Sequence, residues 1–196
     1  MTSLESVTRA RRWAAVALVA TAAGACGSAT SAPTPSPSPA VKRFSSATFS
    51  AVIPKGWSDH TMDQREVQSI NADGMVLMLL IAAHTTANIG NEHIDVSVVA
   101  QPVPDDQLLS YLQSVSQNGA ANVSQPEPFA LGGSSGLFVT YDLMSNDNPP
   151  KALRSQDMIV NHAGETYEIV LNTAAADFDA QQSALNQVLQ TWQWTQ

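Results

Sequence analysis

The chain has 196 residues, of which 9 are Lys or Arg and 17 are Asp or Glu, and its formal net charge is −8 at pH 7. A surface this negative repels phosphate backbones and anionic headgroups, so composition excludes nucleic-acid binding and electrostatic docking to membranes. The single cysteine excludes an intrachain disulfide, and the core must therefore stabilise the fold.

Residues 1–25 have the three-part pattern of a secretory signal peptide. Residues 9–12 contain three arginines, residues 13–22 are apolar, and residues 23–25 are small. An apolar stretch of this length is much shorter than the roughly 20 residues of a membrane-spanning helix. We therefore expect a cleaved signal, through either the general or the twin-arginine export route.

Cys26 directly follows the small residues, as in a lipobox, where the thiol receives a diacylglyceryl group before cleavage. Two or more acyl chains, such as palmitate, would hold the chain firmly on the extracytoplasmic face of the cell membrane. Residues 23–25 also match the site of the general signal peptidase, which would leave a secreted protein. An unpaired cysteine is uncommon in secreted proteins and favours lipidation.

Residues 26–43 join this cysteine to the domain, and four prolines in the segment alternate with Ser and Thr. A segment with so little to bury cannot offset the entropy of ordering. Its prolines favour an extended chain of about 3.1 Å per residue, or a spacer on the order of 50 Å. The composition also allows an O-glycosylated stalk.

The domain itself is predicted to span residues 44–196. Residues 49–53 alternate as a strand and run into a turn, after which Trp57 folds back onto the core. Residues 75–83 are continuously apolar, which indicates a central strand covered on both faces, with a buried helix as the alternative. Residues 95–100 alternate and predict a further strand.

A helix is expected from residue 104, with Asp105 as its N-cap and a stop at Asn118–Gly119. A second helix is expected over residues 175–190. Each has an apolar stripe at helical spacing. The stripes are Leu108, Tyr111, Leu112 and Val115 in the first helix, and Phe178, Leu185, Val188, Leu189 and Trp192 in and just after the second.

Three strands are expected between the helices, over residues 137–143, 154–161 and 167–171. The last two are joined at residues 162–164 as a hairpin. Hairpin connections imply an antiparallel sheet, and amphipathic helices need a sheet face to cover. The sequence therefore predicts an α+β fold, an antiparallel sheet flanked by helices.

Two stretches carry a family likeness, residues 49–57 with their Ile-Pro-Lys-Gly-Trp ending and the hairpin of residues 154–172. With the lipobox and the closing helix, the chain resembles the LpqN/LpqT-type lipoproteins of mycobacteria and their relatives over residues 44–194. Those resemble the PsbP fold, an α/β/α sandwich around an antiparallel sheet. The resemblance implies a PsbP-like domain with a binding or assembly role, no shared catalytic residues and an actinobacterial source.

One motif suggests an enzyme. Residues 132–136 match G-x-S-x-G, the nucleophile elbow of α/β hydrolases, which needs a strand before it and a helix after it. Here a strand is predicted to follow, so a turn between strands explains the glycines better. Catalysis would also need Ser134 beside a histidine and an acid, and a separation beyond hydrogen-bond reach would dismiss it.

No metal or cofactor site is predicted, because the histidines lack the spacing of metal ligands. Among them His162 is expected to be solvated in its turn. Asp177 and Asp179 suggest paired carboxylates, but capping and helix-dipole effects explain them better. Four large side chains are expected in the core or, as the alternative, around an apolar ligand: Trp57, Met75, Met78 and Trp194.

These observations favour a lipid-anchored, non-catalytic binding module of the bacterial cell envelope. Its partners would be the membrane, through the acyl chains on Cys26, and an unidentified envelope protein or lipid. The alternative is a carrier of an apolar or amphipathic envelope ligand, which would need an apolar cavity with one open mouth.

Replacing Cys26 tests the anchor. The wild-type protein is expected to be found in the membrane fraction. It is also expected to incorporate an alkyne analogue of palmitate, because the Cys26 thiol accepts the acylated group. Cys26→Ser is expected to abolish the label and release the protein from the membrane fraction, whereas Ser28→Ala changes neither. A Cys26→Ser protein that stays acylated and membrane-bound would contradict lipidation at this residue.

Overall fold

The computed structural model describes residues 41–71, 76–84, 89–116 and 119–195, all within a compact unit of residues 39–196. The predicted signal peptide, Cys26 and most of the predicted linker therefore lie outside the described residues, as do Met75, Asn118 and the side chain of Val115.

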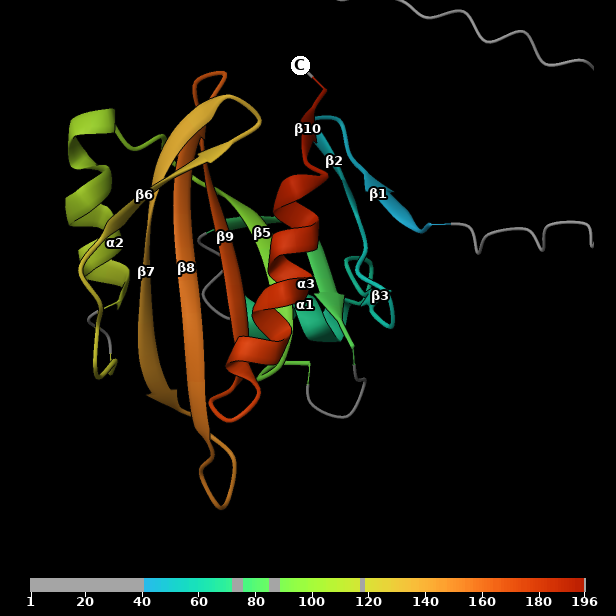
Figure 1. The fold of residues 1–196 in the computed structure, drawn as a ribbon, viewed down its shortest axis with the longest axis vertical. Helices are drawn as coiled ribbons and strands as arrows, with labels where there is room; N and C mark the ends of the chain where they lie inside the picture. Colours follow the sequence, from blue (N-terminus) through green and yellow to red (C-terminus); the bar gives the residue numbers. More distant parts are fainter. Residues whose placement is uncertain (1–40, 72–75, 85–88, 117–118, 196) are drawn as a thin grey trace, which may run out of the picture. The chain divides into compact units, whose positions relative to one another are not determined.

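A seven-stranded antiparallel sheet forms the centre of this unit, in the order β3-β4-β5-β9-β8-β7-β6 (Figure 1). A second, three-stranded sheet has the order β1-β2-β10. The strands are β1 (Arg43–Ser45), β2 (Phe49–Val52), β3 (Ser58–Asp59), β4 (Val76–Ala83), β5 (His93–Val99), β6 (Glu127–Leu131), β7 (Ser134–Met144), β8 (Ala152–His162), β9 (Glu165–Ala174) and β10 (Gln193–Trp194). The helices are α1 (Gln64–Ile70), the 3-10 turn η1 (Asp105–Gln107), α2 (Leu108–Ser116) and α3 (Phe178–Gln190).

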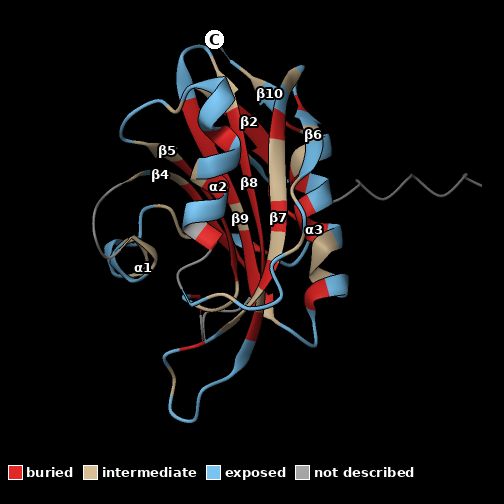
Figure 2. Cartoon of the chain, turned by 90° about the vertical axis from the view of Figure 1, so that its left-hand side faces the viewer, coloured by how far each residue is buried: buried red, intermediate tan, exposed pale blue. Residues whose placement is uncertain are grey.

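Helices cover both faces of the large sheet. The first face packs against α3 and the small sheet, in a core that includes Leu80, Ile169 and Leu185. The opposite face packs against α2, through Leu112 and Ile159, and against α1 in a third cluster. Figure 2 shows α1 and α3 on opposite sides of the sheet, whose strands are largely buried. The predicted α+β architecture is confirmed.

The small sheet joins the beginning and the end of the described unit. The ring of Phe49 in β2 stacks on Trp192, with centroids 3.9 Å apart and planes 2° apart. Arg43 in β1 donates to the Ser50 hydroxyl at 3.0 Å and to the Gln193 side-chain oxygen at 2.9 Å. These contacts hold the segment after α3 against the first strands, although the two are far apart in sequence.

Several sequence predictions are confirmed by this packing. Trp57 is buried in the main core, and Leu108 and Leu112 direct the α2 stripe onto the sheet. The three strands expected between the helices are β7, β8 and β9. The β8–β9 hairpin turns at Ala163 and Gly164, whose φ angles are +50° and +83°.

Other predictions need correction. The apolar run at β4 forms a strand, but not a central one, because only the two-residue β3 lies outside it and Leu77 is 64% exposed. Asp105 does not cap a helix, because the chain enters α2 through η1 and the Asp105 carboxylate accepts from Asn161 instead. Asp177 is the N-cap residue of α3, but its side chain makes no capping hydrogen bond.

Five elements had no sequence prediction: α1, β1, β3, β6 and β10. The short strands β1 and β3 carry too few residues for a detectable alternation. In the described part of the chain, no helix is long and apolar enough to cross a membrane.

Candidate functional site

Strand alternation places a row of polar side chains on the sheet face that α1 and α2 cover. His93 and Asp95 in β5 alternate with core residues, and so do Asp157 in β8 and Glu168 in β9. All four are at most 9% exposed. Because side chains of a strand alternate between faces, the residues that build the core on one face carry this polar row on the other.

The strand register brings the row together. In β9, Asn172 lies opposite His93 of β5 and opposite Ser155 of β8, and Ser155 lies opposite Tyr141 of β7. The Ser155 hydroxyl donates to the Asn172 side-chain oxygen at 2.7 Å. Polar side chains thus run continuously across four neighbouring strands.

Between this row and α1 lies a pocket of about 290 Å³, here called the sheet-face pocket. Ser69 and Ile70 of α1 and Met78 of β4 contribute to its wall. Its polar lining is formed by His93, Asp95, Ser97, Tyr141, Ser155, Asp157, Glu168 and Asn172. A concave site with convergent polar groups is the usual form of a small-molecule site.

His93 is held by both ring nitrogens. Nδ1 lies 2.7 Å from the carbonyl oxygen of Ile89, which only accepts, so Nδ1 carries a proton. Nε2 lies 3.1 Å from Asp95 Oδ1. A protonated imidazole would form an ion pair with Asp95 at this distance.

Asp157 and Glu168 form the second pair. Asp157 is fully buried, and neither of its carboxyl oxygens receives a hydrogen bond. Burial, followed by the nearby Glu168 and Asp95 carboxylates, raises the pKa of Asp157 well above its ordinary value. Burial and the Asp95 charge raise the pKa of Glu168 to about 7. A protonated Asp157 donates to Glu168, so the two carboxyls share a proton.

Two tyrosines border these carboxyls, Tyr141 in β7 and Tyr111 in α2. Burial, with the charges of Asp157 and Glu168 as further causes, raises the pKa of both phenols above their ordinary value. Both therefore stay neutral at physiological pH and keep a hydroxyl that can donate.

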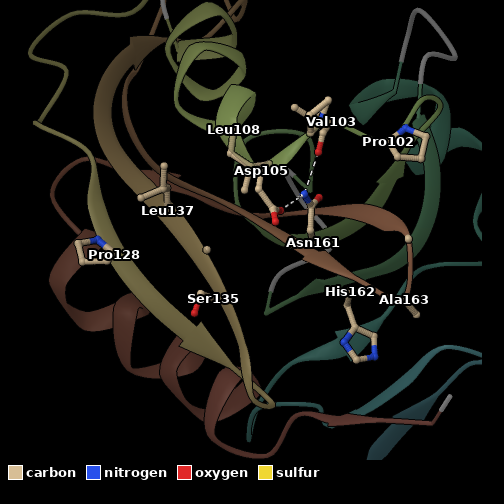
Figure 3. Close-up of a pocket in the computed structure, with 13 residues that line it drawn as sticks. Pro102, Val103, Asp105, Leu108, Pro128, Ser135, Leu137, Asn161, His162 and Ala163 are labelled. Atoms are coloured by element: carbon tan, nitrogen blue, oxygen red, sulfur yellow. Dashed lines mark hydrogen bonds between the residues drawn. The ribbon is translucent and has the colours of Figure 1, made fainter.

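A larger hollow of about 900 Å³ lies beside the start of α2 (Figure 3). Asn161 in this hollow donates to the carbonyl of Val103 at 2.8 Å and to Asp105 at 2.6 Å. Its side-chain oxygen accepts from Thr166 at 2.6 Å. These groups are paired within the protein, whereas His162, which also lines the hollow, has a buried Nε2 without a hydrogen-bond partner.

The structure brings Ser134 and His162 together, with Oγ and Nδ1 2.9 Å apart. His162 is not solvated as expected, because its ring stacks on Trp194 at 3.9 Å and its Nε2 is buried without a hydrogen-bond partner. The separation that would have dismissed a hydrolase is therefore not found. The turn interpretation of the motif is confirmed, since Gly132 and Gly133 have φ of +55° and +90° and link β6 to β7.

The other sequence-predicted residues have mixed outcomes. Trp57 belongs to the main core and Trp194 packs against it, as the core interpretation predicted, whereas Met78 lines the sheet-face pocket. Across the described residues no cluster of three or more His, Cys, Asp or Glu side chains could hold a metal ion. Cys26 cannot be placed, because it lies outside the described residues.

Sequence reasoning missed Asp157 and Glu168. The signal for them was indirect, because both alternate with core residues of a strand and the predicted sandwich also covers the second face of its sheet. In a sandwich with helices on both faces, the second face of a strand is also covered. A carboxylate on that face is then a buried one, and buried carboxylates with perturbed pKa values concentrate at functional sites.

No family model and no curated protein matches the chain. Among solved structures it is similar to the cyanobacterial PsbP protein CyanoP from Synechocystis sp. PCC 6803, with a TM-score of 0.52 and 13% identity over 79% of this chain and 92% of that one. The chain therefore has the PsbP-like fold predicted from its sequence. It is also similar to LpqN of Mycobacterium tuberculosis, a protein involved in cell envelope biogenesis, with a TM-score of 0.51 and 12% identity over 80% of this chain and 86% of that one.

Glu168→Gln tests the buried acid pair. A carboxyl whose pKa rises on folding binds more protons in the folded state, so stability is full at low pH and falls as pH rises from about 4.5 through about 7. The variant loses that dependence. Relative to the wild type, its free energy of unfolding is expected to increase by roughly 1–3 kcal/mol as the pH rises between those limits. Urea unfolding at about pH 4.5 and pH 8 measures the difference in the free energy of unfolding between variant and wild type, with the exposed Glu127→Gln as control. A difference that is the same at both pH values would refute the raised pKa of Glu168.

Ser134 is expected to be inert. It lies at the start of a strand rather than at an elbow, and no hydrogen-bonded carboxylate orients its histidine. A fluorophosphonate probe should therefore label the wild type no more than Ser134→Ala. Labelling that disappears in Ser134→Ala while Ser135→Ala keeps it would establish a reactive serine and overturn this expectation.

Proposed function

We propose that the chain is a lipid-anchored, non-catalytic binding module on the extracytoplasmic face of the cell envelope. In this proposal, the sheet-face pocket receives a small polar ligand. The signal peptide pattern and Cys26 support the anchor. The similarity in fold to LpqN, a protein involved in cell envelope biogenesis, supports the compartment.

The observation that carries the proposal is the buried polar lining of the pocket. Buried polar groups normally have hydrogen-bond partners, and leaving one without a partner costs about 1–3 kcal/mol. Asp157 is completely buried, and once its shared proton is lost neither carboxyl oxygen keeps a hydrogen-bond partner of good geometry. A ligand that donates hydrogen bonds would take the place of that proton and supply the missing partners.

The size of the pocket limits the ligand. A water molecule occupies about 30 Å³ of liquid, so a pocket of about 290 Å³ accommodates on the order of ten non-hydrogen atoms. The ligand is therefore small, with a mass below roughly 200 Da. A complete membrane lipid does not fit.

The carrier alternative has one supporting observation. A hollow of about 460 Å³ is lined by Ile53, Pro54 and Trp57 together with Val41. Ser58 of β3 and Gln187 of α3 also line this hollow, and Trp57 is itself buried in the core. The pocket that does lie between the sheet and α1 is polar, and an apolar ligand would leave its groups unpaired.

Native mass spectrometry of the full chain, purified in a mild non-ionic detergent after exposure to an actinobacterial extract, distinguishes these functions. We expect an adduct below roughly 200 Da that is lost on denaturation. Ser97→Leu narrows the pocket, because Ser97 lines it and is 2% exposed, and should lose the adduct. Ser183→Leu on the exposed side of α3 should keep it.

The outcomes separate cleanly. A small adduct that disappears only in Ser97→Leu supports the proposal. An adduct of lipid mass that survives Ser97→Leu favours the carrier. A mass with no adduct in any sample would contradict both ligand-binding functions.

A further inference from the structure

The charge of the sheet-face pocket limits what can bind in it. His93 Nε2 lies 3.1 Å from Asp95 Oδ1, so the imidazole, when protonated, is a cationic partner for this carboxylate. Asp157 and Glu168 have no such cationic partner. None of the lysines and arginines in the described part of the chain lines the pocket.

The basic side chains closest in sequence are engaged elsewhere. Arg154 in β8 donates to Asp142 at 2.8 Å and lies over the ring of Phe178, on the face covered by α3. Lys151 pairs with Asp147 at 3.2 Å, near the β7–β8 connection. The protein thus buries two adjacent acids without supplying a cation, and only a proton between them offsets their repulsion.

We propose that the sheet-face pocket binds a small organic cation, a primary ammonium or guanidinium, whose N–H groups replace the proton shared by Asp157 and Glu168. This inference rests on the proposed function and names the ligand class of the same site. A cation of this kind supplies hydrogen-bond donors to the Asp157 oxygens, which have no partner of good geometry in the protein.

The rest of the lining suits an alkyl cation better than a metal ion. Ile70, Met78, Leu143 and Val170 give the pocket an apolar part, against which an alkyl chain can pack. Both nitrogens of His93 are already engaged, and no set of three or more metal-ligating side chains occurs among the described residues.

The exchange is balanced in charge. A monocation enters from water, the carboxyl pair releases one proton to water, and the pocket keeps the same net charge. The titratable groups that face the exchange are His93 and Asp95 from β5, Asp157 from β8, Glu168 from β9, Tyr141 from β7 and Tyr111 from α2. Ser69 and Ile70 of α1 and Val76 and Met78 of β4 add none.

Because a proton competes with the ligand, affinity should rise with pH. Loss of one proton on binding increases the affinity by up to about tenfold for each pH unit. Because Tyr111 and Tyr141 stay neutral over this range, the pH dependence of the affinity comes from the carboxyls. The expected direction is therefore tighter binding at about pH 8 than at about pH 6.

Isothermal titration calorimetry of the full chain in mild detergent tests the inference, with n-butylammonium, n-butanol and butyrate as probes. We expect butylammonium to bind roughly tenfold or more tightly at about pH 8 than at about pH 6. Heats in two buffers of different ionisation enthalpy should show protons released. Butanol and butyrate should bind at least about tenfold more weakly than butylammonium, since they bring no cation.

Asp157→Asn keeps the side-chain shape but removes the charge, and it should reduce butylammonium affinity about tenfold or more. The neutral amide replaces a carboxyl that is already protonated, so folding is not endangered. Asp106→Asn, at an exposed acid outside the pocket, should change nothing. Glu168→Gln is the second variant and should act like Asp157→Asn.

Each result decides the question. Selective, pH-dependent butylammonium binding that is lost in Asp157→Asn supports the inference. If butanol binds as tightly as butylammonium, the inference that the ligand is a cation is overturned, but the pocket remains a site for a polar ligand. Absence of binding by all three probes overturns the cation, and an adduct in native mass spectra then shows whether the proposed function survives.

Discussion

Two carboxyl groups buried side by side on a sheet form the constraint on which this site depends. Asp157 and Glu168 cannot both be ionised in that position without a counter-ion, because the charges repel each other and have lost their hydration. No lysine or arginine among the described residues lines the pocket, so a proton offsets the repulsion between the two carboxylates. A proton can leave to water when a cation binds. A permanent salt bridge with a lysine or arginine would instead occupy the carboxylates and block the pocket.

The fold tolerates this arrangement because its largest hydrophobic core lies on the other face of the sheet. The main core there joins β4, β5, β8 and β9 to α3 and the small sheet, and its stacked Phe49 and Trp192 fasten the two ends of the described unit. Burial of large apolar side chains contributes about 1.5–3 kcal/mol each. The polar face can therefore carry the unfavourable burial of acids, as sites tuned for binding commonly do.

The sequence predicted the architecture well because alternation and helical stripes report on burial directly. Residues such as Tyr167, Ile169 and Leu171 occupy one face of β9, and they are buried as expected. It did not predict the site, because His93, Asp95 and Glu168 occupy alternate strand positions that resemble a solvated face. Only the presence of α1, a helix with no buried residue, and α2 over that face makes them interior. Likewise, the contact of Ser134 with His162 depends on β7–β8 pairing, which no local pattern encodes.

The proton shared by Asp157 and Glu168 can be observed directly. Carbon-13 NMR of the side-chain carboxyls, titrated with n-butylammonium at about pH 7, reports the protonation of Asp157 and Glu168 separately. We expect a protonated Asp157 in the free protein and a shift to the ionised form as the cation binds. An Asp157 carboxyl that is already ionised without ligand, or one that keeps its proton at saturating butylammonium, would contradict it.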